Sequence, residues 1–377
     1  MKLGLLGLDF KSGNMGCQAL AYAFYLNLPK FTDKQIDCII MIEGDEEEVT
    51  IPKLDSVTNS VIFFKTKNRS QMKEIKKEIM SCDYVVDFTN GDSFSDIYGI
   101  KRMIKVSIPK IATIKKNTPL ILGPQTYGPY NKTLSKKMAK YILKNAKTVC
   151  TRDEMSAEMI NKLTGQKPED FTDIAFMLPY NQTEKKEKSV GINVSGLLWN
   201  GGYTGNNQFG LKVDYREYIT NIIKYLQENG YRAYLIPHVI TKSKENVEND
   251  ITAIEEIQKM FEGVVASPEF KNPIEAKEYI ASMEFFIGSR MHSTIAGVST
   301  KVPTVAFSYS RKFEGLYENI DYPYVLNAKE LTTDEAFEKT IEYINNRDKM
   351  KEDLERSAIK IKEKTDGLTQ WFSKQFK

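Results

Sequence analysis

The sequence predicts an α/β protein with two Rossmann-like domains that face a cleft. Short apolar runs, typical of strands buried on both faces, alternate with amphipathic helices in both halves of the chain. A polar, charged stretch without periodicity, residues 179–188, separates the two alternating patterns. The length of 377 residues also favours two domains, at roughly 100–200 residues each.

These observations divide the chain into four expected segments. Residues 1–178 should form the N-terminal Rossmann-like domain, and residues 179–188 the linker. Residues 189–345 should form the C-terminal Rossmann-like domain, and residues 346–377 a set of C-terminal helices. Each half is long enough to bury its own core.

Composition excludes several classes of protein. A net charge of +3 argues against a dedicated nucleic-acid binder. No run approaches the ~20 apolar residues of a membrane helix, and the run Leu3–Leu8 is shorter than the ~7–15-residue core of a signal peptide. The four cysteines form no Cys-x-x-Cys pair, so we expect neither a zinc site nor a disulfide framework. A reduced, cytoplasmic setting follows.

The basic excess lies at the C-terminal end. From Arg347 to Lys377 there are 9 basic and 6 acidic residues, and Trp371, Phe372 and Phe376 accompany them. These helices could touch an anionic membrane surface weakly. Packing of the aromatic side chains on the body of the protein is the favoured alternative.

In the N-terminal half, strands and helices alternate in order. Helices are expected over residues 17–28, 70–81 and 134–145, and strands over residues 3–8, 38–42, 61–64, 84–88, 119–122 and 148–150. The loop Asp9–Gly16, which holds Asn14, joins the first strand to the first helix. Such a glycine loop can cradle a phosphate at the helix N-terminus, or it can be only a tight turn.

Three loops at strand ends of this half carry polar candidates. Asp92 and Asp96 follow the strand at 84–88, where they could bind a substrate hydroxyl, act as a base, or form an Asx-turn and a helix cap. Gln125 offers a polar contact in the loop Gly123–Pro129. Arg152 could meet an anion, or pair with Asp153 or Glu154.

The C-terminal half restarts the pattern with a strand at Val190–Val194. The glycine-rich loop Gly196–Gly210 follows, as a lid, a sugar-stacking loop or a plain surface loop. Asp214 should cap a helix that runs to Asn229, and the strand Tyr231–Pro237 delivers His238 at its carboxyl end, as a functional or a structural residue.

The stretch 284–312 carries the main candidate site. Phe285–Ile287 and Thr304–Phe307 should be parallel neighbouring strands whose carboxyl ends open on one edge, where open α/β sheets bind ligands. A helix follows the first of these strands, and either Ser289 or Ser293 can cap it. The candidate residues that follow the two strands are Ser289, Arg290, His292, Ser293, Arg311 and Lys312. Such a crevice suits a small, multiply charged anion, with an imidazole as acid or base. Alone, Arg311 and Lys312 are better explained as surface residues.

Four motifs, in this order and spacing, resemble the polysaccharide pyruvyl transferase family. They are Leu122-Gly-Pro-Gln-Thr-Tyr-Gly-Pro129, Thr151-Arg-Asp-Glu-Met-Ser156, Ile236-Pro-His238 and Ile287-Gly-Ser-Arg-Met-His292. The resemblance extends from Asn14 to about Glu318. It departs at Asn90-Gly-Asp-Ser93, where the family has a more glycine-rich run, and at Cys17, where an aspartate is common.

The resemblance implies a fold similar to GT-B glycosyltransferases, with the acceptor on the N-terminal domain and the donor on the C-terminal domain. It implies phosphoenolpyruvate as donor and a sugar of a surface-polysaccharide precursor, expected to be lipid-linked, as acceptor. The product would be a cyclic pyruvate ketal, with phosphate released. No cofactor, metal or nucleic-acid partner is expected, and the enzyme would work in the cytoplasm, where the inner face of the membrane is one place for it.

Carried over by motif, the resemblance assigns catalytic roles to Arg152, His292 and Lys312. Further substrate contacts would come from residues near these motifs and strand ends, namely Arg290, Arg311, Ser289, Ser293, Asn14, Asp92, Gln125 and His238. Two other functions remain open: a GT-B glycosyltransferase that uses a nucleotide sugar, and a carbohydrate-binding relative without catalysis.

Overall fold

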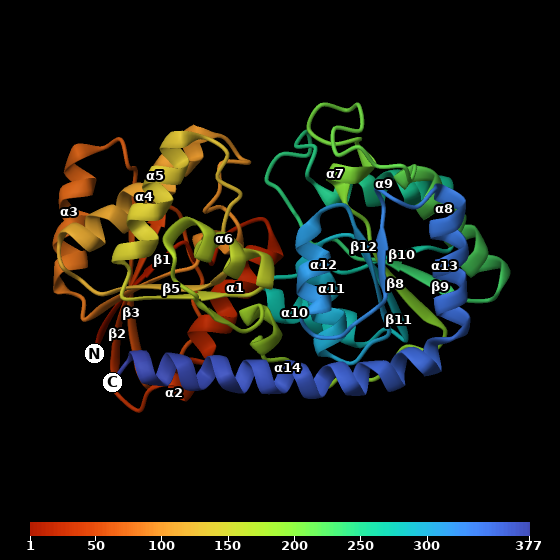
Figure 1. Ribbon diagram of the computed structural model, residues 1–377. Coiled ribbons are helices and arrows are strands. Elements are labelled where there is room, and N and C mark those ends of the chain that lie inside the picture. Colours follow the sequence, from red (N-terminus) through yellow and green to blue (C-terminus); the bar gives the residue numbers. More distant parts are fainter. The chain divides into compact units, whose positions relative to one another are not determined.

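A computed structural model describes the backbone of residues 1–377 and every side chain except those of Arg311 and Lys312. The chain divides into two compact units, each built on its own parallel sheet (Figure 1). Unit 1 comprises Met1–Lys11, Leu20–Met177 and Glu363–Lys377, and unit 2 comprises Ser12–Ala19 and Leu178–Lys362. Both units follow the α/β fold that the sequence predicts.

Unit 1 contains a seven-stranded parallel sheet in the order β3-β2-β1-β4-β5-β6-β7. The strands are β1 (Lys2–Leu6), β2 (Ile36–Glu43), β3 (Val57–Phe64), β4 (Tyr84–Asp87), β5 (Leu120–Gln125), β6 (Thr148–Thr151) and β7 (Glu169–Asp170). The chain order reverses between β1 and β4, as in Rossmann folds. The carboxyl ends of these two strands are therefore the predicted place for a ligand in unit 1.

The helices accompanying this sheet are α1 (Met15–Leu26), α2 (Leu28–Phe31), α3 (Arg69–Ser81), α4 (Ile100–Lys115), α5 (Thr133–Asn145) and α6 (Glu154–Thr164), with 3₁₀ turns η1 (Thr89–Gly91) and η2 (Ile174–Met177). Helix α3 begins at Asn68, whose side chain accepts hydrogen bonds from the N–H groups of Ser70 and Gln71. Its apolar face, including Ile75 and Ile79, is buried in the core of unit 1. The sequence analysis did not identify α4.

The end of the C-terminal helix belongs to the core of unit 1. Phe372 is fully buried, and its ring stacks on Phe31 and packs against Phe24. Trp371 and Phe376 are buried as well. The favoured expectation, packing on the body, is confirmed for these aromatic side chains, so they are not the exposed anchors that a membrane contact would need.

Unit 2 contains a six-stranded parallel sheet in the order β10-β9-β8-β11-β12-β13. The strands are β8 (Ser189–Asn193), β9 (Arg232–Leu235), β10 (Val265–Ala266), β11 (Phe285–Gly288), β12 (Thr304–Ser308) and β13 (Val325–Asn327). Strand β11 pairs in parallel with β12, with Phe286 opposite Thr304. The prediction that these two strands are parallel neighbours is confirmed.

The helices of unit 2 are α7 (Gly196–Trp199), α8 (Tyr215–Glu228), α9 (Asp250–Met260), α10 (Pro273–Ala281), α11 (Met291–Ser299), α12 (Arg311–Glu318) and α13 (Thr333–Asn345), followed by α14 (Arg347–Gln375). In Figure 1 the sheet lies between α8 and α13 on one side and α10, α11 and α12 on the other. Asp214 caps α8 as expected, accepting the N–H of Glu217. The expected loop Gly196–Gly210 instead begins with α7, capped by Ser195. Residues 346–377 form one long helix rather than several.

Two further short segments attach to unit 2. Asn14 forms an antiparallel bridge with Val239, and Met15 donates its backbone N–H to the carbonyl of His238. In the expected linker, which contains no helix or strand, Lys186 donates its backbone N–H to the carbonyl of Ser282, just beyond α10. Residues 12–19 therefore pack with unit 2, although they precede the expected boundary by more than a hundred residues.

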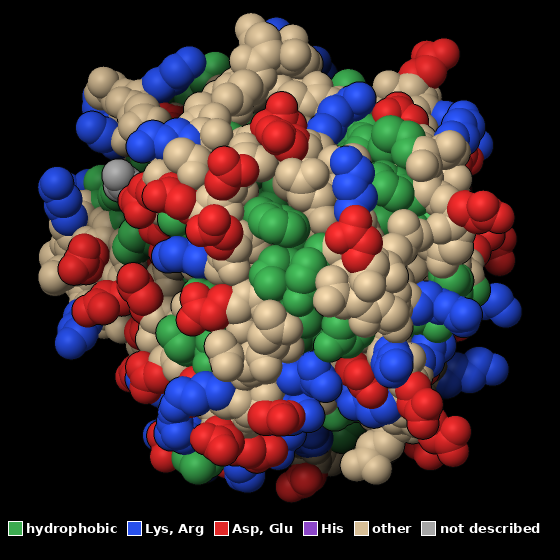
Figure 2. Space-filling model, turned by 90° about the vertical axis from the view of Figure 1, so that its right-hand side faces the viewer, with side chains coloured by type: hydrophobic (Ala, Val, Ile, Leu, Met, Phe, Trp, Pro, Cys, Tyr) green, Lys and Arg blue, Asp and Glu red, His purple; other side chains and the backbone are tan. Residues whose placement is uncertain are grey.

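The surface mixes charges of both signs. On the face drawn in Figure 2, Lys and Arg alternate with Asp and Glu around a smaller apolar area. This agrees with the near balance of 53 basic and 50 acidic residues in the sequence. Throughout the described chain, no helix combines the length and apolar character needed to cross a membrane.

Candidate active site

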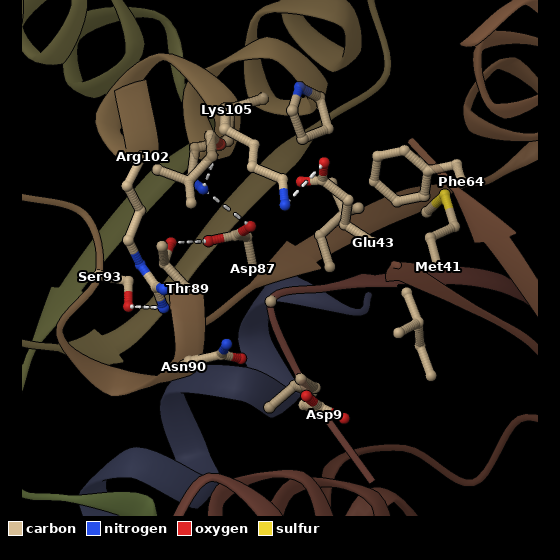
Figure 3. A pocket seen from close by; sticks show the side chains of 17 residues that line it. Asp9, Met41, Glu43, Phe64, Asp87, Thr89, Asn90, Ser93, Arg102 and Lys105 are labelled. Atoms are coloured by element: carbon tan, nitrogen blue, oxygen red, sulfur yellow. Dashed lines mark hydrogen bonds and ion pairs between the residues drawn. The ribbon is translucent and has the colours of Figure 1, made fainter. Parts of the chain in front are cut away.

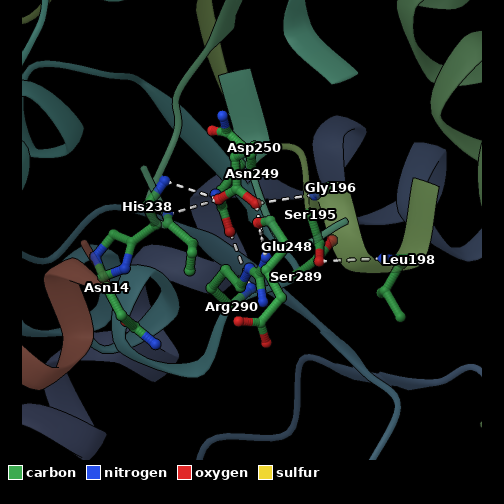
Figure 4. Close-up of polar contacts among 12 residues, drawn as sticks. Asn14, Ser195, Gly196, Leu198, His238, Glu248, Asn249, Asp250, Ser289 and Arg290 are labelled. Atoms are coloured by element: carbon green, nitrogen blue, oxygen red, sulfur yellow. Dashed lines mark hydrogen bonds and ion pairs between the residues drawn. The ribbon is translucent and has the colours of Figure 1, made fainter. Parts of the chain in front are cut away.

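The candidate site lies at the carboxyl edge of the unit 2 sheet. The central strands β9, β8 and β11 are adjacent and parallel, so their carboxyl ends meet there. Asn193 ends β8, His238 follows β9, and Arg290 follows β11. Figure 4 shows His238, Arg290 and Asn14 gathered around the start of α9.

An ion pair anchors Arg290. Its Nη2 donates to Asp250 Oδ1 at 2.7 Å and to the carbonyl of Glu248 at 2.8 Å. The side chains are 10% and 0% exposed, so the pair is buried. Burial alone would lower the pKa of Arg290, but attraction to Asp250 outweighs it and raises that pKa above its ordinary value. The guanidinium is therefore a permanent cation.

Asp250 also holds the backbone around the site. Its Oδ1 accepts the N–H of Gly196 at 2.8 Å, and its Oδ2 accepts the N–H groups of His238 and Val239 at 2.9 and 2.8 Å. The sequence analysis missed this residue. Asn249, which caps α9, followed by an acidic residue in the first helical turn, is the signal that could have found it.

Arg290 keeps one buried donor unused. Its Nε is inaccessible to solvent, and no acceptor lies within hydrogen-bonding distance in the described structure. An unpaired buried donor is unfavourable, and such groups usually have a ligand, ion or water as partner. An anion at this edge would supply the acceptor.

His238 is buried and neutral. Only 3% of the residue is exposed, and burial lowers the pKa of its imidazole to about 3, with smaller electrostatic contributions from His292 and Arg290 nearby. Its Nδ1 is buried and has no hydrogen-bond partner among the described residues. The side chain can therefore offer an uncharged imidazole to a ligand.

His292 lies in the first turn of α11, against the loop before α1. A side-chain carbon added at Gly16 would come within 2.3 Å of His292 Nδ1, so only glycine leaves room for this imidazole. Asn14 Oδ1 accepts the N–H of Gly16 at 2.9 Å and holds the loop in place.

The two serines do not cap α11 as expected. The residue at the cap position is Arg290, and no side chain caps this end. Ser289 Oγ lies 2.7 Å from Tyr215 Oη, and Ser293 Oγ donates to Asn193 Oδ1. Both serines instead support the strand ends, because buried hydroxyls need partners.

Asn193 is a further residue that the sequence analysis missed. Its Oδ1 also accepts the backbone N–H of Arg290 at 2.9 Å, and its Nδ2 donates to the carbonyl of Ile236. It thereby ties the ends of three strands together. An asparagine that ends a buried apolar strand is the signal for it.

The remaining candidates that can be described lie in unit 1. Arg152 is buried and pairs with Asp173, Nη1 to Oδ2 at 2.5 Å, instead of the expected Asp153 or Glu154. Gln125 is fully buried, and its Nε2 contacts the carbonyl of Asp87 at 3.3 Å. Asp92 accepts a hydrogen bond from Tyr98 Oη.

The sequence-based predictions for Asp96 and for Arg311 and Lys312 can also be compared with the structure. Asp96 accepts the N–H groups of Asn131 and Lys132, which precede α5, but no side chain caps that helix. Arg311 and Lys312 begin α12, but their side chains lie outside the described residues. Among the described residues, no group of three or more His, Cys, Asp and Glu side chains could hold a metal ion.

Comparisons with known proteins agree with this architecture. The family model "Polysaccharide pyruvyl transferase" matches residues 20–311, most of the chain. The amylovoran biosynthesis protein AmsJ of Erwinia amylovora is 22% identical over 270 residues. That match covers 67% of this chain and 63% of AmsJ, so it spans less than two thirds of the relative.

Solved structures share the fold over nearly the whole chain. The UDP-GlcNAc 2-epimerase of Neisseria meningitidis has a TM-score of 0.57 at 12% identity, covering 98% of this chain and all of that one. A sucrose-phosphate synthase of Thermosynechococcus elongatus has a TM-score of 0.59 at 7% identity, covering 100% and 98%. At these identities the likeness shows the fold alone, which is of the GT-B type. With the family model spanning residues 20–311, the chain belongs to the polysaccharide pyruvyl transferase family.

Proposed function

We propose that the protein transfers the pyruvyl group of phosphoenolpyruvate to a sugar of a cell-surface polysaccharide precursor, forming a cyclic pyruvate ketal and releasing phosphate. One observation carries the proposal within the site: the buried Arg290 cation with an unpaired Nε, beside His238 and His292. Family membership supports the same reaction. No cofactor enters the proposal.

The donor's two anionic groups need cationic partners. Phosphoenolpyruvate carries a phosphate and a carboxylate, and charge-assisted hydrogen bonds from guanidinium groups bind both well. Arg290 is the proposed contact in unit 2. Arg152 and Lys312 stay proposed contacts by family motif, with Arg311 beside Lys312.

His292 is the proposed general acid. The mechanism needs a proton on C3 of the donor, and His238 is a poor source because burial keeps its imidazole neutral. Protonation of C3 turns the vinyl carbon into a methyl group and leaves C2 cationic. Histidine is suited to the role because an imidazole can both donate and accept a proton in the physiological pH range.

The rest of the reaction balances without a further reactant. One sugar hydroxyl attacks C2, the C2–O bond to phosphate breaks, and a second hydroxyl of the same sugar closes the ketal. The proton gained at C3 and the proton that leaves with phosphate are matched by the two hydroxyl protons. Products are the ketal carboxylate and hydrogen phosphate.

The acceptor is proposed to be a lipid-linked glycan, reached from the cytoplasm at the inner face of the membrane. Phosphate release from phosphoenolpyruvate, measured against a panel of lipid-linked and model glycosides, tests the function. Release of a nucleotide from a nucleotide sugar, without use of phosphoenolpyruvate, would instead identify a glycosyltransferase. Sugar binding with neither reaction would identify a binding protein.

A further inference from the structure

Unit 1 contains a pocket whose lining includes none of the residues discussed for catalysis. It lies at the carboxyl ends of β1, β2, β3 and β4, beside α4, and its volume is about 190 Å³ (Figure 3). One water molecule needs about 10–15 Å³ on this scale, so the pocket is roomy enough for a solute much larger than water. Open α/β sheets bind ligands at such a reversal of strand order.

Charges of both signs line the pocket in equal number. Three anionic and three cationic side chains contribute, namely Asp9, Glu43, Asp87, Arg102, Lys105 and Lys110. The set carries no net charge, so it gives little preference for an anion such as phosphate. Among the described residues it also provides no cluster suited to a metal ion.

A buried ion pair forms part of the lining of the pocket. Lys110 Nζ and Asp87 Oδ2 lie 3.0 Å apart, with side chains 1% and 2% exposed. Thr89 donates its hydroxyl to Asp87, and Lys110 also donates to the carbonyl of Val106. These groups satisfy one another, so they shape the pocket rather than take up the ligand's charge.

Other polar groups of the lining are more exposed than this pair. Lys105 Nζ lies 3.1 Å from Glu43 Oε1, and Arg102 donates to Ser93 Oγ at 2.9 Å. The side-chain Oδ1 of Asn90 is buried and has no hydrogen-bond partner among the described residues. The lining thus contains both donors and acceptors, and one buried acceptor still lacks a donor.

We propose that this pocket is the subsite for one neutral sugar ring. Each hydroxyl of a sugar donates and accepts, which matches a mixed lining of carboxylate, ammonium, guanidinium and amide groups better than a charged ligand does. Apolar side chains of the lining, among them Phe64 and Met41, match the C–H faces of a pyranose. We further assign this sugar as the acceptor, and that assignment alone rests on the proposed function.

Titration with methyl glycosides, without phosphoenolpyruvate, tests the subsite. Saturation-transfer NMR on the full chain would use methyl glycosides of glucose, galactose, mannose and N-acetylglucosamine at millimolar concentration, with inorganic phosphate as the charged comparison. We expect at least one glycoside to bind. Lys105→Met and Arg102→Met should each weaken it by about tenfold or more, the size of one lost hydrogen bond to a charged group.

Lys101→Met is the matched control, because Lys101 is exposed on the same helix and does not line the pocket. It should bind the glycoside as the unchanged protein does, and the thermal midpoints of all three variants should agree. The proposal is overturned if no glycoside binds, if the two pocket variants bind as the control does, or if phosphate competes for the pocket. None of these outcomes depends on turnover, so a failure of the pyruvyl transfer assay would leave the result standing.

Discussion

At the residue scale, one buried carboxylate organises the candidate active site. Asp250 accepts hydrogen bonds from Arg290 and from the backbone on both sides of the site, at Gly196 and His238. The motif Ser-Arg-Met-His made Arg290 and His292 predictable from sequence. Asp250 was not predictable in this way, because its partners lie at least 11 residues away along the chain.

Removing Asp250 should destabilise unit 2 strongly. Asp250→Ala leaves the Arg290 cation buried without its partner, which costs about 3–5 kcal/mol. Urea unfolding measures the change in the free energy of unfolding. Asp334→Ala, at an exposed position in α13, should cost less than about 1 kcal/mol. Equal effects in the two variants would contradict the anchoring role.

His238 should make stability depend on pH in the acid range. Its pKa is about 3 when folded and about 6.5 in the unfolded chain, so between these values only the unfolded chain holds the proton. The free energy of unfolding should therefore fall by roughly 1.4 kcal/mol per pH unit as pH drops from about 6 towards 3. His238→Gln should remove this part of the slope. An unchanged slope in the variant would show that another group causes it.

At the element scale, regular apolar runs were predictable and contact-dependent features were not. The pair β11 and β12 follows from two short apolar runs joined by a helix. Helix α4 was not predicted from the sequence, because Pro109 lies inside it and interrupts the expected helical pattern. The role of residues 12–19 depends on contacts with Val239 and His238, more than 200 residues away, which no local pattern records.

Helix α10 contains a buried lysine whose effect on the stability of the protein depends on pH. Lys277 donates to the carbonyl of Leu178, and burial lowers its pKa to about 7, against about 10.4 in the unfolded chain. Between these values only the unfolded chain is protonated, so stability should rise from pH 7 to pH 10. Lys277→Met should abolish this rise in thermal unfolding. Lys259→Met, on the exposed face of α9, should leave it intact.

At the scale of the whole molecule, the two sheets repeat one strand order without a repeat in sequence. The α/β class and both sheets were predictable, because buried strands alternate with amphipathic helices throughout. The membership of the C-terminal residues in unit 1 was not, since it depends on packing between Phe372 and rings near the other end of the chain.

Phe372 should contribute strongly to the stability of the protein, although it lies near the C-terminus. Phe372→Ala removes a fully buried ring that packs on Phe24 and Phe31, and should cost about 3–5 kcal/mol. Chemical denaturation of the full chain measures it. Ile359→Ala, 63% exposed on the same helix, is the control and should change stability by less than about 1 kcal/mol. A small loss for Phe372→Ala would contradict the packing described.

The proposed pyruvyl transfer is tested most directly by product analysis in heavy water. The protein would be incubated with phosphoenolpyruvate and a glycoside that supports phosphate release, and the product examined by mass spectrometry and NMR. We expect a cyclic ketal whose methyl group carries one solvent deuterium, with one phosphate released per ketal. His292→Gln should lose about 10²–10⁴-fold in rate while still binding the donor. Phosphate released without a ketal, or a ketal methyl group without deuterium, would contradict the proposal.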